Sequence, residues 1–99
     1  MQDKFQELIS SQEPVLIDFY ATWCGPCQAM APVLENVKDE IGDNARVVKI
    51  DVDRFPQIAG MYDVRSIPTL MIFKQGELLW RHTGTAPKAQ LVQLLQSFM

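Results

Sequence analysis

The sequence predicts an α/β fold in which a mixed sheet of about four strands is flanked by helices on both faces. Strand-like apolar segments alternate along the chain with amphipathic helical segments, which is the order of a βαβ unit. The segment 15–20 is apolar on both sides except for one acid, as expected of a central strand covered on both faces. Later in the chain, the two-residue turn Gln75-Gly76 joins two strands as an antiparallel hairpin.

Each element has its own local signal. Phe5, Leu8 and Ile9 share one face of a short helix. The segment from Pro26 places an apolar residue every three or four positions, which predicts a long helix that faces the sheet. Pro87 suits the first turn of a last helix. The predicted elements are a helix at 3–10, a strand at 15–20, a helix from 26 to about 41, a strand at 46–53, a helix at 56–62, strands at 69–74 and 77–82, and a helix from 87 onward. The strand at 46–53 should lie parallel to the first through a right-handed crossover.

Composition excludes several classes of protein. Ninety-nine residues allow one compact domain, which we expect to span 1–99. The net charge is −3 and no stripe of Lys and Arg exists, so we expect no nucleic-acid partner. No apolar run of about 18 residues exists, so we expect no membrane span. The first residues lack the basic and then apolar run of a signal peptide, which favours a cytoplasmic location, although processing could expose any mature start.

Both cysteines lie in the motif Trp23-Cys24-Gly25-Pro26-Cys27, between a buried strand and a helix. A C-x-x-C pair at this junction indicates a dithiol/disulfide redox site. Cys24 opens the helix, where unpaired N–H groups and the helix dipole stabilise a thiolate, so we expect an exposed nucleophile there. Cys27 lies one turn further on, faces inward and would attack a mixed disulfide at Cys24. Gly25 permits close backbone approach, and Pro26 costs no needed hydrogen bond.

The alternative use of the two cysteines is metal binding. A structural zinc site needs about four ligands, and His82 is the only other soft candidate in the chain. We therefore expect no metal. A structural disulfide is also disfavoured, because a loop this short hardly constrains the unfolded chain and because a reducing compartment favours catalytic cysteines.

Asp18 is a second signal, because a carboxylate in a buried strand is costly unless it is protonated or paired. Burial should raise its pKa, which suits a proton acceptor for Cys27. Lys49, on the neighbouring parallel strand, is the expected partner that tunes Asp18. The alternative is a structural buried ion pair between the two side chains.

Two further residues are candidates for contact with a substrate. A cis bond between Ile67 and Pro68 would turn the chain sharply and leave the backbone groups of Ile67 free to pair with an extended peptide. Only about 5–6% of such bonds are cis, so the residues alone do not favour it. Trp23 lies beside a tight turn, and we expect it to be an exposed or half-exposed apolar contact for protein substrates.

Together these residues resemble the thioredoxin family, from about Phe5 to the end of the chain. The matching segments are the Trp23-Cys24-Gly25-Pro26-Cys27 motif, Asp18-Phe19 at the buried acid, Lys49-Ile50-Asp51 in the neighbouring strand, Ile67-Pro68-Thr69 at the cis-proline corner and Gly84 at the substrate groove. The resemblance implies the thioredoxin fold and a protein-disulfide reductase that uses no cofactor beyond its redox-active disulfide. It implies protein disulfides as substrates and recharging by a thioredoxin reductase. We also expect a monomer. The resemblance also implies that Pro68 is cis, that Cys24 attacks, that Cys27 resolves and that Asp18 assists through a proton or water path.

The chain departs from the family pattern in several places. Most thioredoxins have an extra strand before the first helix, but only 1–4 precede Phe5. We therefore expect four strands, in the order second, first, third, fourth, with 46–53 as an exposed edge that Lys49 and acidic residues protect from pairing with other chains. Three positions differ from common family residues, namely Tyr20 for tryptophan, Gln28 for a basic residue and Ser66 for glycine. These differences should affect partner choice and redox potential rather than the chemistry.

Two other functions remain open. A disulfide oxidase or isomerase would need an oxidising compartment, and Gly25-Pro26 in place of a histidine-containing pair argues against it. A non-catalytic binding or assembly subunit would use the hydrophobic groove around Trp23 and Pro68. Replacing both cysteines by serine would separate these functions, because binding should survive and disulfide reduction should vanish.

Overall fold

The computed structural model describes the backbone of residues 2–99 and the side chains of residues 3–99. Its helices and strands follow the predicted order. They are α1 (Gln2–Ile9), β1 (Val15–Tyr20), α2 (Gly25–Ile41), a 3-10 turn (Gly42–Asn44), β2 (Arg46–Asp51), α3 (Pro56–Met61), β3 (Thr69–Lys74), β4 (Glu77–Thr83) and α4 (Lys88–Ser97).

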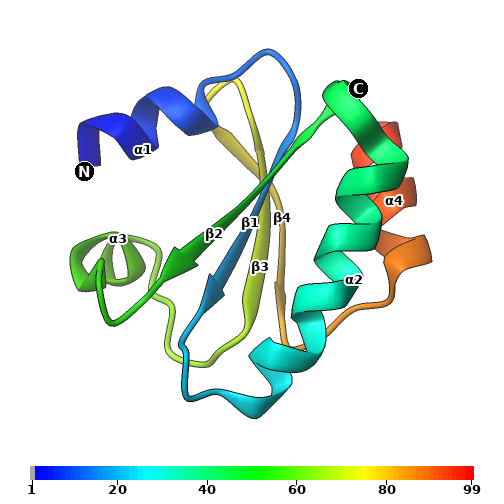
Figure 1. The fold of residues 1–99 in the computed structure, drawn as a ribbon. Helices are drawn as coiled ribbons and strands as arrows, with labels where there is room; N and C mark the ends of the chain where they lie inside the picture. The colour runs from blue at the N-terminus through cyan, green and yellow to red at the C-terminus, as the bar shows by residue number, and fades with distance from the viewer. Residues whose placement is uncertain (1) are drawn as a thin grey trace.

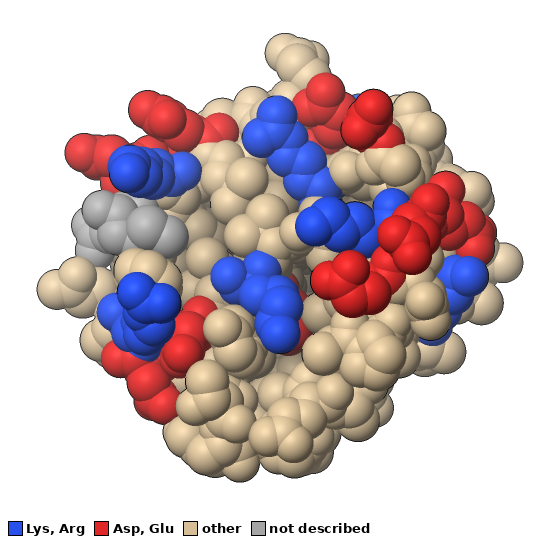
Figure 2. All heavy atoms as spheres, in the orientation of Figure 1, with Lys and Arg blue, Asp and Glu red and all other residues tan. Residues whose placement is uncertain are grey.

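The four strands form one mixed sheet in the order β2-β1-β3-β4, as predicted. β1 is parallel to β2 and antiparallel to β3, and β3 is antiparallel to β4. Helices α2 and α4 cover one face of the sheet, and α1 and α3 cover the other (Figure 1). β2 lies nearest to the viewer in this orientation. Figure 2 shows the same face with all atoms as spheres, and both acidic and basic side chains are present on it.

A separate apolar core fills each side of the sheet. The core under α2 and α4 contains twelve buried residues, namely Leu16, Met30, Leu34, Val37, Ile41, Ala45, Leu70, Ile72, Ala86, Leu91, Val92 and Leu95. The core under α1 and α3 contains nine, namely Phe5, Ile9, Val15, Ile17, Phe19, Ile50, Ile58, Met71 and Phe73. β1 contributes to both cores, because successive side chains of a strand point to opposite faces.

Several element boundaries differ from their predictions by one residue, and the two that follow have clear local reasons. The strand predicted at 46–53 ends at Asp51, because the chain turns there: Asp51 Oδ1 accepts from the N–H of Asp53, and its carbonyl accepts from Phe55. The last helix begins at Lys88 and not at Pro87. Pro87 has φ −75° and ψ 153°, so it precedes the first turn as an extended N-cap residue.

Candidate active site

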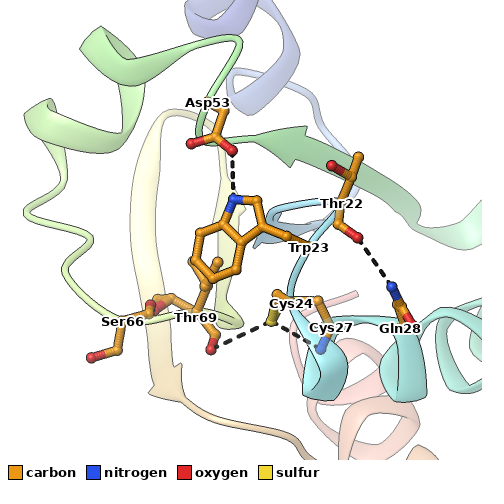
Figure 3. The surroundings of a disulfide bond; sticks show 9 residues. Thr22, Trp23, Cys24, Cys27, Gln28, Asp53, Ser66 and Thr69 are labelled. Carbon is orange, nitrogen blue, oxygen red and sulfur yellow. Dashed lines mark hydrogen bonds between the residues drawn. A yellow bond between two sulfur atoms is a disulfide. The ribbon is translucent and has the colours of Figure 1, made fainter.

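The redox turn is built by the end of β1 and the start of α2. Cys24 is the N-cap residue of α2, with φ −89° and ψ 115°, and Pro26 lies in the first turn. The backbone N–H of Cys27 donates to Sγ of Cys24 over 3.2 Å (Figure 3). An N–H aimed at this sulfur, at the positive end of a 17-residue helix, stabilises negative charge on it when the disulfide is open.

Cys24 and Cys27 are joined in a disulfide, with their Cα atoms 5.2 Å apart. Cys24 is only 4% exposed and Cys27 2%, so the prediction of an exposed Cys24 is wrong for this oxidised state. The two sulfurs pack with Ala21, and partly buried Tyr20 and Ile67 cover the same cluster. Sγ of Cys24 also lies 3.8 Å from the carbonyl oxygen of Ile67. The loop that carries Cys24 is therefore covered by the loop that carries Ile67, and the local sequence of neither loop predicts this contact.

That second loop carries the proline corner. The bond between Ile67 and Pro68 is cis. The N–H of Ile67 donates to no residue among those that the structure describes. Gly84, at φ +105°, donates its N–H to the carbonyl of Pro68 over 2.8 Å. A side chain is strained at this φ, so glycine suits the position. The fold thus brings Ile67 beside Cys24, and Gly84 beside Pro68 in the same corner.

Trp23 is 70% exposed, the largest exposed fraction among the large apolar side chains of the described chain. Its indole N–H donates to Oδ2 of Asp53 over 2.8 Å, and Figure 3 shows the ring extending from the redox turn toward this carboxylate. The sequence reasoning did not single out Asp53. A signal for it existed, because Trp23 and Asp53 follow the carboxyl ends of two parallel strands, and these ends meet at one edge of the sheet.

Asp18 is completely buried in β1, and neither carboxylate oxygen has a hydrogen-bond partner among the described residues. Its register partners are Lys49 on β2 and Leu70 on β3, and Leu70 belongs to the core under α2. Asp18 therefore faces the side of the sheet that α2 covers, and Cys27 lies in the first turn of this helix. Burial raises the pKa of Asp18 to about 6, and the positive charge of Lys49 opposes this rise.

Lys49 forms no ion pair with Asp18 in the described part of the chain. Its Nζ lies over the ring of Tyr20, 4.3 Å from the ring centre. The arrangement is therefore a buried carboxyl group with a nearby cation, and not the structural ion pair that was the alternative. Sequence reasoning named Tyr20 only as a departure from a family pattern. Its place beside Lys49 follows from the register, since Tyr20 and Asp18 share one face of β1.

Metal binding has no support in residues 3–99, since they contain no group of three or more His, Cys, Asp or Glu able to hold an ion. His82 lies on β4, stacked on Trp80, with Nε2 3.0 Å from the carbonyl oxygen of Thr85. Among the described helices, none combines the length and the apolar character needed to cross a membrane.

Comparisons with known proteins agree with this site. The family model for thioredoxin matches residues 1–97. A thioredoxin-like protein of Synechocystis sp. is 52% identical over 96 residues, which are 96% of this chain and 91% of that protein. Chloroplastic thioredoxin Y of Oryza sativa subsp. japonica is 48% identical over 94% of this chain, which spans 56% of its length. The structure of a mutant thioredoxin from Halobacterium salinarum superposes with a TM-score of 0.89 at 39% identity, covering 99% of this chain and 85% of that one. With its C-x-x-C pair at disulfide distance in a four-stranded thioredoxin fold, the chain belongs to the thioredoxin family of disulfide oxidoreductases.

Proposed function

We propose that this chain reduces disulfides of other proteins, with Cys24 as the nucleophile and Cys27 as the resolving cysteine. The observation that carries the proposal is the position of Cys24 at the N-cap of α2, with the N–H of Cys27 on its sulfur. Both features stabilise a thiolate at Cys24 and none acts in the same way on Cys27. The roles of the two sulfurs should therefore differ.

The reaction needs two exchanges between sulfur atoms. In the first, the Cys24 thiolate attacks one sulfur of the substrate disulfide, a bond to Cys24 forms, and the other substrate sulfur leaves as a thiolate that takes a proton. In the second, Cys27 loses its proton and attacks Sγ of Cys24, which releases the second substrate thiol. The product is the Cys24–Cys27 disulfide, the state of this structure. Two electrons pass from the cysteine pair to the substrate, so the reaction requires no cofactor.

Asp18 is proposed as the acceptor of the Cys27 proton. A general base works best when its pKa lies near the working pH. Burial brings the pKa of Asp18 to about 6, and Lys49 limits the rise. Both oxygens lack partners in the described chain, so they are free to receive a proton directly or through water.

The surface around Cys24 is proposed to hold an extended segment of the substrate. The unpaired backbone N–H of Ile67, at the cis Pro68 corner, can pair with such a segment. Gly84 keeps the corner free of a side chain, and exposed Trp23 offers an apolar contact. Gly25 and Pro26 complete the rim of the proposed site, and a Cβ added to Gly25 would meet nothing within 4 Å.

The proposal extends to partners and location. A thioredoxin reductase would return the Cys24–Cys27 disulfide to the dithiol, since turnover needs a source of electrons. We propose a monomer that acts in the cytoplasm. The relatives named thioredoxin 1, from Synechococcus elongatus and Nostoc sp., support this location, and the chloroplastic relatives make a plastid the alternative.

Reduction of insulin by the chain and a dithiol donor tests the proposed roles. Cys24→Ser should abolish turnover and form no adduct with the substrate. Cys27→Ser should also stop turnover but should accumulate a mixed disulfide at Cys24, visible by mass spectrometry. If the Cys24→Ser chain formed an adduct at Cys27 faster than the Cys27→Ser chain forms one at Cys24, the two assignments would be reversed. The redox potential of the pair separates a reductant from an oxidase, and retention of function by the doubly substituted chain would favour the binding subunit.

A further inference from the structure

β2 is an outer strand of the sheet, and its free edge is the feature that carries this inference. At the two ends of the β1–β2 ladder, the N–H groups of Arg46 and Val52 donate to the carbonyls of Pro14 and Tyr20. Alternate residues of a parallel strand face alternate neighbours. Val47 and Lys49 therefore direct their N–H and C=O groups away from β1, where no described strand lies beside them (Figure 1).

A hollow lies on each side of this edge. One, of about 470 Å³, lies between β2 and α2 and is lined by apolar groups of Ala31, Pro32, Leu34 and Val47. The other, of about 440 Å³, lies between Arg46 and the α1 side chains of Lys4, Glu7 and Leu8. An added strand would send successive side chains to opposite faces, that is, alternately into the two hollows.

The charge around the edge favours an acidic occupant. The two hollows are lined by four basic residues, namely Lys4, Lys38, Arg46 and Lys49, and by two acidic residues, namely Glu7 and Glu35. None of the four cations forms an ion pair with a residue that the structure describes. The local excess of +2 contrasts with the net charge of −3 for the whole chain. Figure 2 shows basic side chains over the middle of this face, with acidic side chains next to them toward the right and the top.

We propose that the free edge of β2 binds an extended segment of a partner protein that combines valine-like and acidic side chains and adds to the sheet as a further strand. Hydrogen bonds to the backbone groups of Val47 and Lys49 would fix the register of the added strand against β2. Small apolar side chains would contact Val47 and Val48, and acidic ones would lie opposite Arg46 and Lys49. Lys49 is expected to protect this edge from pairing with other chains. That protection acts against a second copy of this chain, which would bring a second set of basic residues, but not against an acidic segment.

The proposal concerns a surface apart from the Cys24–Cys27 turn, so its test uses the oxidised chain and needs no catalysis. The probe is a capped hexapeptide of threonine, glutamate, two valines, glutamate and threonine. The sequence of the probe reads the same in both directions, so its side chains fit parallel or antiparallel pairing with β2. In a nuclear magnetic resonance titration, we expect saturable shifts of the Val47, Lys49 and Asp51 amides. A probe with lysines in place of glutamates should bind about tenfold more weakly.

Two controls separate strand pairing from general attraction. Two variants of the probe carry methyl groups on alternate backbone nitrogens. The variant whose methylated nitrogens face β2 should not bind, and the variant whose methylated nitrogens face away from β2 should bind as before. Arg46→Glu should weaken the glutamate probe and strengthen the lysine probe, whereas Arg54→Glu, beyond the end of β2, should change neither. Arg46 keeps its backbone bond to Pro14 in this variant, so β2 should remain paired with β1.

Three results would overturn the proposal. Shifts centred on Trp23, Ile67 and Gly84 would mean that the probe binds at the redox turn. Equal binding of both methylated probes would exclude pairing through the backbone. Dimers of the protein alone by sedimentation, with slow exchange of the Val47 and Lys49 amides, would mean that a second copy occupies the edge.

Discussion

The two faces of β1 are equally buried from Val15 to Phe19 but have different chemical content. Val15, Ile17 and Phe19 point to the α1 side, where the core is apolar and buried Thr69, opposite Phe19, donates its hydroxyl to the carbonyl of Ser66. On the α2 side, Leu16 is followed by Asp18, which is just as inaccessible to solvent. Tyr20 ends this face beside the two cysteines and under the ammonium group of Lys49.

This difference indicates a division of labour within one six-residue strand. The apolar face contributes to the free energy of folding through burial and close packing. The other face holds a carboxyl group whose ionised form is destabilised by burial, and a strand gains nothing in stability from such a group. Substitutions on the two faces should therefore move stability and activity in different combinations.

The largest change in stability should come from the apolar face. Phe73 lies opposite Val15, is 1% exposed and packs edge-on against Phe5 and Tyr62, with ring centres 6.0 and 5.3 Å away. Phe73→Ala should lower the free energy of unfolding by about 3–5 kcal/mol, because it leaves a cavity. Urea denaturation measures the loss. Turnover per folded molecule should stay unchanged.

Phe73→Leu is the matched control, because it keeps most of the buried volume and should cost less than about 1.5 kcal/mol. If Phe73→Leu lowered insulin reduction while leaving stability intact, the apolar face would have a part in catalysis, and the division between the two faces would fail.

Asp18→Asn should have the next largest effect on stability. Above about pH 6 it should raise the free energy of unfolding, whereas Phe73→Ala lowers it. The pKa of Asp18 is about 6 in the folded chain against an ordinary 3.8, so between these values the folded chain holds the extra proton. Stability should then fall as pH rises from about 4 through 6, by about 3 kcal/mol in all, and stay low above that. Asn should remove this fall. It should also slow reduction at neutral pH by up to about 10²-fold, because Cys27 loses its proton acceptor.

Unfolding at pH 3 and at pH 8 measures the effect of this substitution on stability. The Asn chain should match the parent at the lower pH and exceed it at the higher. A parent chain whose stability did not change between these pH values would show that Asp18 is not held protonated by the fold.

The sequence predicted the scaffold well because its signals are local. The apolar run 15–20, the C-x-x-C pair and the Gln75-Gly76 turn each determine the structure within a few residues, whereas the strand order was predicted from the resemblance to thioredoxins. Asp18 was singled out for the same reason, since a lone acid inside an apolar run is visible without a structure.

The remaining features of the site depend on contacts between distant segments. Ile67 covers Cys24 from 43 positions away, and Asp53 holds Trp23 from 30 positions away. The burial of Cys24 could not be predicted from its own loop, because the covering residues come from the proline corner. Lys49 was named as the partner of Asp18, but the ring over which its ammonium lies requires the register of β1 against β2.

Lys49→Met should have a smaller effect, confined to the α2 face. The positive charge of Lys49 holds down the pKa of Asp18, so its removal should move that pKa above about 6. Carbon-13 resonances of the Asp18 carboxyl group, followed against pH, measure the shift. Stability should fall above pH 6 by about 0.2–1 kcal/mol, the range for an exposed charge, and should not change near pH 4.

Lys38→Met is the control, since Lys38 lines the same hollow and does not contribute to the pKa of Asp18. An equal shift in both variants would mean that Asp18 responds to the overall charge of the chain and not to Lys49.

The smallest effect should come from the contact between Lys49 and Tyr20. An ammonium group 4.3 Å from an aromatic ring centre contributes about 0.5–1 kcal/mol at an exposed site. Tyr20→Leu removes the ring, and Tyr20→Phe keeps its face, so the loss should appear in the first variant and not in the second. A double-mutant cycle of Tyr20→Leu with Lys49→Met isolates the contact from the packing of Tyr20, because only the coupling between the two substitutions reports it. If that coupling were zero while Lys49→Met still moved the pKa of Asp18, Lys49 would act on Asp18 without being held by Tyr20. The α2 face would then owe its chemistry to Asp18 and Lys49 alone.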